Sequence, residues 1–224
     1  MLFKTRAVAI SYIRFRESSI IARFFTETFG LQSFVINGVR STKSKTAPGF
    51  FQPLSLLDVV QYHDEKKDLH RLHEIKTAHP FCSISIQPVK SAMAIFAAEV
   101  LGKSVKEGQH NQPLFDLIWD WAVALDARTE GFETEHIRLL WEMMTPLGII
   151  PEQWTEILKD KHQNSSSQEQ IAFLQWITQQ TGLAPKTSNH AKQEVLDSLL
   201  RYTATHLEGM GTVQSLQVLR EVFR

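Results

Sequence analysis

The chain has 224 residues, and its 24 Lys and Arg balance 24 Asp and Glu, so the formal net charge is zero. Its single cysteine, Cys82, excludes an intramolecular disulfide and a zinc site made of several thiolates, and it suits a reducing compartment. No segment reaches the roughly 18 apolar residues of a membrane-spanning helix, and three cations interrupt the first 15 residues, where a signal peptide would be apolar, so we expect a soluble cytoplasmic protein without a membrane partner.

The zero net charge conceals an asymmetry between two parts of the chain. Residues 1–80 hold twelve Lys and Arg against seven Asp and Glu, a net charge of +5, and the remainder carries −5. Such an asymmetry indicates that the first part meets a polyanion.

The first 80 residues alternate apolar and polar side chains with the period of two that is typical of strands. Gly30 ends a turn, and Pro53 places the first part of the fourth strand at a sheet edge or a bulge. Five short strands predict a small barrel or sandwich. The expected strands cover residues 5–15, 20–26, 31–39, 50–62 and 69–77.

Near Pro80 the apolar period changes from two to 3.6, which is typical of helices. Asn111 is a candidate N-cap, with Pro113 in the first turn that follows it. No segment after residue 84 has the pattern of a strand. The expected helices cover residues 92–100, 111–127, 132–147, 168–181, 191–207 and 212–223. The chain is therefore expected to be α+β, with a basic β-domain over residues 1–80 and an acidic helical domain over residues 81–224.

The segment between the third and fourth expected strands carries three cations and no acid: Arg40, Lys43 and Lys45. Cations on a small polar loop are suited to contacts with phosphates, whose counterions they release. The alternative is an ordinary solvated loop, but the sign bias and the strand context favour nucleic acid. Further candidates on the same barrel are Arg14, Arg16, Arg23, Lys4 and Arg6. Of these, Arg16 could instead pair with the adjacent Glu17.

Two adjacent aromatic residues, Phe50 and Phe51, follow the basic segment. Neighbours on a strand point to opposite faces, so we expect one of the two to point outward, where it could stack on a base.

Other patterns favour neither a metal nor catalysis. His70 and His73 would lie on opposite faces of a strand, and no pair of thiolates accompanies them. Asp116 and Asp120 share a helix face, as in a metal-dependent nuclease, but the polar face of an amphipathic helix is the ordinary explanation. The sequence has no phosphate-binding P-loop and no G-x-S-x-G motif. We predict no metal, no cofactor and no enzymatic activity.

The order of several motifs resembles the RecO family of bacterial DNA repair proteins, recombination mediators of the RecFOR pathway. Within residues 14–59, these motifs are Thr26-Glu27 with Gly30, Gly38-Val39-Arg40, and Gln52-Pro53-Leu54. Residues 96–125 and 136–152 resemble helical segments of the same family. Many members carry a four-cysteine zinc site after these segments, and residues 152–182 contain no cysteine. We therefore predict no structural zinc.

The resemblance implies a five-stranded OB-fold over residues 1–80 that binds DNA, followed by an α-helical domain. It implies binding of single- and double-stranded DNA, annealing of complementary strands, and loading of RecA onto DNA coated by single-stranded DNA-binding protein. The implied partners are RecR and the acidic C-terminal tail of that protein, and the implied location is cytoplasmic and nucleoid-associated. A tail pocket needs an apolar cavity beside a cation, for which Arg138, Lys192 and Arg201 are candidates. The alternative is a non-catalytic scaffold whose basic barrel binds an acidic protein segment.

Overall fold

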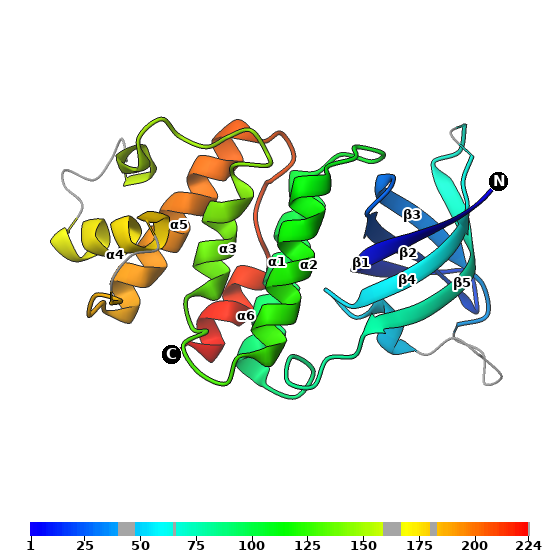
Figure 1. Cartoon of the computed structure of the whole chain (residues 1–224), viewed down its shortest axis with the longest axis horizontal. Coiled ribbons are helices and arrows are strands. Elements are labelled where there is room, and N and C mark those ends of the chain that lie inside the picture. The colour runs from blue at the N-terminus through cyan, green and yellow to red at the C-terminus, as the bar shows by residue number, and fades with distance from the viewer. Residues whose placement is uncertain (40–47, 65, 159–166, 180–182, 224) are drawn as a thin grey trace.

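The computed structural model describes residues 1–39, 48–64, 66–158, 167–179 and 183–223. A β-barrel stands at one end of an elongated molecule, and helices form the rest (Figure 1). The barrel is closed in the strand order β1-β2-β3-β5-β4. Its strands are β1 (Leu2–Phe15), β2 (Ser19–Thr26), β3 (Gly30–Ile36), β4 (Leu56–Tyr62) and β5 (Leu69–His79). All neighbouring strands are antiparallel except β3 and β5, which confirms the predicted OB-fold.

The barrel interior is filled because small residues on β1 face large ones on β2. Ala9 pairs with Phe24, and both side chains are buried. The Phe24 ring in turn lies 5.3 Å from that of Phe34 on β3, measured between centroids. Burying one such aromatic side chain stabilises the fold by about 1.5–3 kcal/mol.

The first half of the predicted fourth strand is wrong. The chain forms a short 3-10 helix, η1 (Pro48–Phe51), and β4 begins only at Leu56. Pro53 has no N–H to donate, and Leu54 takes a positive φ of 70°, which no strand residue adopts. The Leu54 amide instead donates a single hydrogen bond of 2.8 Å to the carbonyl of Ala9. The other four predicted strands are confirmed, with bounds that differ by one to three residues.

All six predicted helices are present. α2 begins as expected, because the Asn111 side chain accepts a hydrogen bond of 3.1 Å from the amide of Leu114. The sequence did not predict the short 3-10 helix η2 (Trp154–Leu158). None of the helices in the described ranges is long and apolar enough to cross a membrane. The helices are α1 (Pro88–Ser104), α2 (Gln112–Ala127), α3 (Glu135–Met143), α4 (Gln168–Gln179), α5 (Asn189–His206) and α6 (Ser215–Val222).

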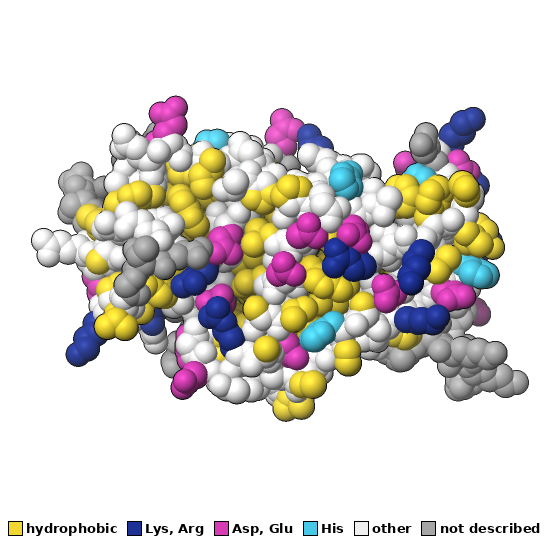
Figure 2. Space-filling model, viewed as in Figure 1, with side chains coloured by type: hydrophobic (Ala, Val, Ile, Leu, Met, Phe, Trp, Pro, Cys, Tyr) yellow, Lys and Arg dark blue, Asp and Glu magenta, His cyan; other side chains and the backbone are white. Residues whose placement is uncertain are grey.

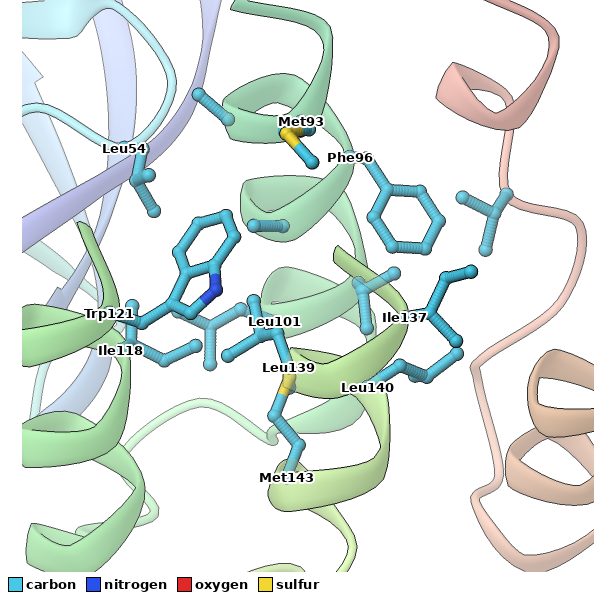
Figure 3. Close-up of a cluster of buried hydrophobic side chains, with 14 of the residues drawn as sticks. Leu54, Met93, Phe96, Leu101, Ile118, Trp121, Ile137, Leu139, Leu140 and Met143 are labelled. Atoms are coloured by element: carbon cyan, nitrogen blue, oxygen red, sulfur yellow. The ribbon is translucent and has the colours of Figure 1, made fainter. Parts of the chain in front are cut away.

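The outer wall of the barrel and the helices share one hydrophobic core, and the barrel interior forms a second one. Side chains from the outer barrel wall, among them Val8 and Phe25, belong to the same buried cluster as those of α1, α2 and α3. Figure 3 shows Leu54 reaching from the barrel toward Met93 on α1 and Trp121 on α2. The two parts are therefore packed directly on each other.

The segment between α1 and α2 also contacts the barrel through its backbone. Gly108 donates a hydrogen bond of 2.8 Å to the carbonyl of Leu31, and Glu107 forms a parallel β-bridge with the same residue. Gly30 makes this approach possible, because a Cβ at that position would lie 2.0 Å from the carbonyl oxygen of Gln109. The start of β3 is thus covered by a segment from the helical part.

Candidate nucleic-acid interface

Arg40, Lys43 and Lys45 lie outside the described residues, but both flanks of their segment are in place. Val39 and Phe51 are buried in the barrel core. The Ser19 hydroxyl donates a hydrogen bond of 3.0 Å to the side chain of Asn37, which joins the start of β2 to the residue after β3. The segment therefore leaves and re-enters the described structure at the end of the barrel where β1 turns into β2. We call this the hairpin end, and its described members are Tyr12, Arg14, Arg16, Asn37, Val39, Phe50 and Phe51.

The hairpin end carries two exposed cations. Arg14 lies near the end of β1, and Arg16 lies in the turn that follows. The Arg16 guanidinium lies 5.1 Å from the centroid of the Phe15 ring, and no ion pair forms between Arg16 and Glu17. Neither arginine has an ion-pair partner among the described residues, so both guanidinium groups are available to an anion.

A third cation, Arg71 on β5, lies beside this end, although the sequence analysis did not single it out. Arg71 and Asn37 line the same hollow, of about 260 Å³, where β3 ends and β5 continues. Arg71 is exposed and makes no ion pair within the described part of the chain. The parallel pairing of β3 with β5 brings it next to Val35, and that pairing is not visible in the sequence.

The aromatic residues at the hairpin end differ from one another in exposure. Phe51 is 2% exposed and lies parallel to Phe24, with 6.3 Å between ring centroids. It cannot stack on a base, because Phe24 lies against its ring and almost none of the side chain is in solvent. Phe50 is half-buried. Tyr12, which the sequence analysis did not consider, is 48% exposed and lies edge-on to Phe51 at 6.2 Å.

Arg6, a candidate for contacts with DNA, makes its contacts within the protein. Its guanidinium donates two hydrogen bonds to Glu27, of 2.9 and 2.7 Å, and also lies 3.4 Å from Asp116 on α2. It is stacked over the rings of Phe115 and Trp119, 5.2 and 4.8 Å from their centroids. The hydrogen bond with Glu27 raises the pKa of Arg6. Arg6 therefore fastens the barrel to α2, and its charge is neutralised there.

Arg23 is also neutralised. Its Nε lies 3.5 Å from Oε1 of Glu107, which accepts a hydrogen bond of 3.0 Å from the Ser33 hydroxyl as well. Arg23 and Ser33 lie on the outer face of β2 and β3, the face that OB-folds commonly use for oligonucleotides. Here an acid from the helical part occupies that face.

Lys4 is exposed near the opposite end of β1 and has no ion-pair partner in the described ranges. Ten strand residues separate it from Arg14, roughly 33 Å along an extended strand. Figure 2 shows one face of the molecule on which Lys and Arg side chains alternate with Asp and Glu. Among the described residues, Arg14 and Arg16 at the hairpin end are two exposed cations, two positions apart in the sequence, for which no ion pair is formed.

Two of the histidines, His63 and His70, form a packed polar cluster with Gln32. The Gln32 amide nitrogen lies 3.2 Å from Nδ1 of His63 and 3.1 Å from Nε2 of His70. The His63 ring stacks on Phe29 with 3.9 Å between centroids. Burial lowers the pKa of His70, and the neighbouring His63 acts in the same direction. Within the described ranges, no three His, Cys, Asp or Glu side chains are grouped so that they could hold a metal ion.

The helical part contains an apolar cavity of about 390 Å³ with a cation at its lining. Lys192 on α5 contributes the cation and has no ion-pair partner in the described structure, whereas Arg220 pairs with Asp197 at 2.5 Å. Burial lowers the pKa of His136 to about 3, so its imidazole is neutral. Arg138 and Arg201, the other two candidates for such a rim, do not line this cavity. Its apolar lining includes Phe132, Ile137, Leu196, Leu219 and Phe223.

Comparison with known proteins places this fold in a family. A family described as "Recombination protein O N terminal" matches residues 1–81. The chain is 32% identical over 241 residues to the DNA repair protein RecO of Flavobacterium psychrophilum, with all of both chains covered. It is 31% identical to that of Flavobacterium johnsoniae, again over both whole chains. It is 28% identical to that of Bacteroides fragilis, covering all of this chain and 92% of the relative. The chain belongs to the RecO family, the family that its motifs resemble.

Proposed function

We propose that this protein acts in DNA repair as a recombination mediator without enzymatic activity. It binds single- and double-stranded DNA, anneals complementary strands, and helps to load RecA onto DNA coated by single-stranded DNA-binding protein. The observation that carries the DNA-binding part is the hairpin end, where Arg14 and Arg16 are exposed beside both flanks of the basic segment. The repair role itself rests on membership of the RecO family.

The mechanism is charge neutralisation. Two complementary strands repel each other, and a cationic surface that holds both lowers this barrier. Each Lys or Arg that contacts a phosphate releases counterions, so binding weakens as salt rises. Arg6 and Arg23 take no part, because Glu27 and Glu107 already neutralise them.

The cavity beside Lys192 is the proposed site for the acidic C-terminal tail of single-stranded DNA-binding protein. Its apolar lining suits hydrophobic side chains of a peptide, and the ammonium group of Lys192 suits a carboxylate. RecR is a further proposed partner. In this proposal, residues 1–80 are the DNA-binding domain and residues 81–224 are the domain that binds partner proteins.

Fluorescence anisotropy with a labelled single-stranded oligonucleotide tests the DNA site. We expect the wild type to bind with a log–log salt slope of about −0.7 per phosphate contacted. The Arg14→Ala/Arg16→Ala variant should flatten this slope by roughly 1.4, and an Arg40→Ala/Lys43→Ala/Lys45→Ala variant by roughly 2. A Lys4→Ala/Lys66→Ala variant removes two exposed cations from the other end of the barrel and should leave the slope near that of the wild type.

The same assay separates this proposal from the scaffold alternative. If the wild type does not bind DNA even at low salt, the proposed DNA site is wrong, and an acidic protein segment becomes the expected ligand of the barrel. If both double variants flatten the slope equally, DNA contacts the barrel without preference for the hairpin end.

A further inference from the structure

The outer part of β1 extends beyond the strand that pairs with it on one side. Its pairing with β4 ends at Val8 and Leu56, whereas its pairing with β2 continues to Phe15 and Ser19. Four consecutive residues, from Ser11 to Arg14, are exposed as a result. An aromatic residue in such a position is placed to meet a ligand.

Tyr12 lies on the row of β1 that faces the barrel interior. Its register partner is Ala22, which is fully buried, and its ring packs edge-on against buried Phe51. Phe51 is in turn held parallel to Phe24. Buried aromatic rings therefore support the Tyr12 ring while about half of its surface remains in solvent. A ring that is already positioned loses little side-chain entropy when a ligand binds.

The charge around Tyr12 indicates what that ligand is. Arg14 follows two residues later, on the same face of β1, because its register partner Ile20 is also an interior residue. Arg16 lies in the adjoining turn, and the chain enters the basic segment from Val39, which is packed on the same core. An aromatic ring beside cations suits a polyanion that also carries exposed flat rings. Single-stranded nucleic acid has both features, whereas a duplex hides the faces of its bases.

We propose that Tyr12 is a base-stacking residue that gives the hairpin end a preference for unpaired strands. This inference rests on the proposed function, since it assigns a residue within the proposed DNA site. Tyr12 contacts the bases, and the arginines beside it contact the phosphates. Replacing Tyr12 should therefore weaken single-strand binding without affecting the phosphate contacts that a duplex also makes.

The test compares four variants with the wild type, using single-stranded, duplex and abasic oligonucleotides of equal length. Tyr12→Ala should weaken single-strand binding roughly tenfold, within the range known for base–aromatic stacking, and duplex and abasic binding should stay unchanged. Tyr12→Phe should retain binding. Tyr12→Leu can still pack on Phe51 but offers no flat ring, so it should lose single-strand affinity to the extent expected for Tyr12→Ala. It therefore tests the inference even if Tyr12→Ala folds poorly. Ile13→Ala, on the opposite face of β1 and 63% exposed, is the matched control and should bind as the wild type does.

A second readout reports stacking directly. A 2-aminopurine base in the single strand should lose fluorescence on binding to the wild type and to Tyr12→Phe, but not to Tyr12→Leu. Equal single-strand affinity of Tyr12→Leu and wild type would overturn the inference while leaving the proposed function intact. Equal losses on single-stranded and abasic DNA would also overturn it, because Tyr12 would then act on the backbone. A wild type that binds no DNA at low salt would overturn both.

Discussion

Arg6→Ala separates a structural cation from a DNA-binding one. The substitution removes two hydrogen bonds to Glu27 and the stacking over Phe115 and Trp119. Because the Arg6 side chain is 37% exposed, the ion pair is screened, and we count it at about 1 kcal/mol. The two cation–π contacts add about 0.5–1 kcal/mol each. The free energy of unfolding should therefore fall by about 2–3 kcal/mol.

Urea denaturation, followed by circular dichroism, measures this change. Lys4→Ala is the matched control, because Lys4 is an exposed cation on the same strand without an ion pair to any described residue. It should change the free energy of unfolding by less than about 0.5 kcal/mol. DNA affinity of Arg6→Ala, measured at a temperature where it is folded, should equal that of the wild type. A stability change as small as that of the control, or a loss of affinity like that expected for Arg14→Ala/Arg16→Ala, would refute the assignment of Arg6 as an anchor.

The pairing of Arg6 with Glu27 also predicts how the effect of Arg6→Ala on stability changes with pH. The hydrogen bond from Arg6 lowers the pKa of Glu27 below its ordinary 4.5, although burial acts in the opposite direction. Because this pKa is lower in the folded state, the stabilisation is fully present above about pH 4.5 and is lost as pH falls through the folded-state value. The difference in stability between wild type and Arg6→Ala should therefore shrink below that pH. A difference that grows on acidification would contradict the pairing.

Three further substitutions test other contacts. Glu107→Gln should raise the affinity for single-stranded DNA at low salt several-fold, because it frees Arg23 and removes a negative charge from the barrel surface. An unchanged affinity in the anisotropy assay would show that the Arg23–Glu107 ion pair does not affect DNA binding. Asp126→Asn should lower the free energy of unfolding, measured by urea denaturation, by about 2 kcal/mol, because the buried carboxylate accepts three backbone hydrogen bonds from the segment before α1. A near-neutral result would show that this carboxylate is dispensable. Lys192→Ala should weaken binding of an acidic tail peptide about tenfold, measured by calorimetry. Lys186 is an exposed lysine outside the cavity, and Lys186→Ala should not weaken this binding. Equal effects of the two substitutions would show that the peptide does not bind in this cavity.

Local patterns were sufficient to predict most of the fold. The alternation of β1 and β2 and the cap at Asn111 depend on residues close in sequence, so propensity and periodicity find them. The η1 segment was missed because apolar residues continue through it, while Pro53 and the positive φ of Leu54 divert the backbone. A run of apolar side chains does not distinguish a strand from an anchored turn.

The candidate site could be predicted only in part, because it depends on contacts between distant residues. The acids that neutralise Arg6 and Arg23 include Asp116 and Glu107, which come from the helical part of the chain. A count of the charges in residues 1–80 does not include these two acids. The exposure of Tyr12 could not be predicted for a similar reason, because it depends on where the pairing of β1 with β4 ends.

The shared core between barrel and helices bears on how such a protein would work. Gly102 on α1 lies so close to Ile10 on β1 that a Cβ there would be 2.5 Å from the Ile10 methyl group. Together with the Arg6 anchor, this packing fixes the outer wall of the barrel against the helical part, while the barrel interior next to the hairpin end forms a separate buried cluster. A DNA strand on the barrel and a protein tail in the cavity would then be held at a fixed separation. Binding of one raises the effective concentration of the other only when a DNA–protein complex can span that separation. If the proposed DNA and tail sites are both correct, this geometry would favour single-stranded DNA that still carries its binding protein over either component alone.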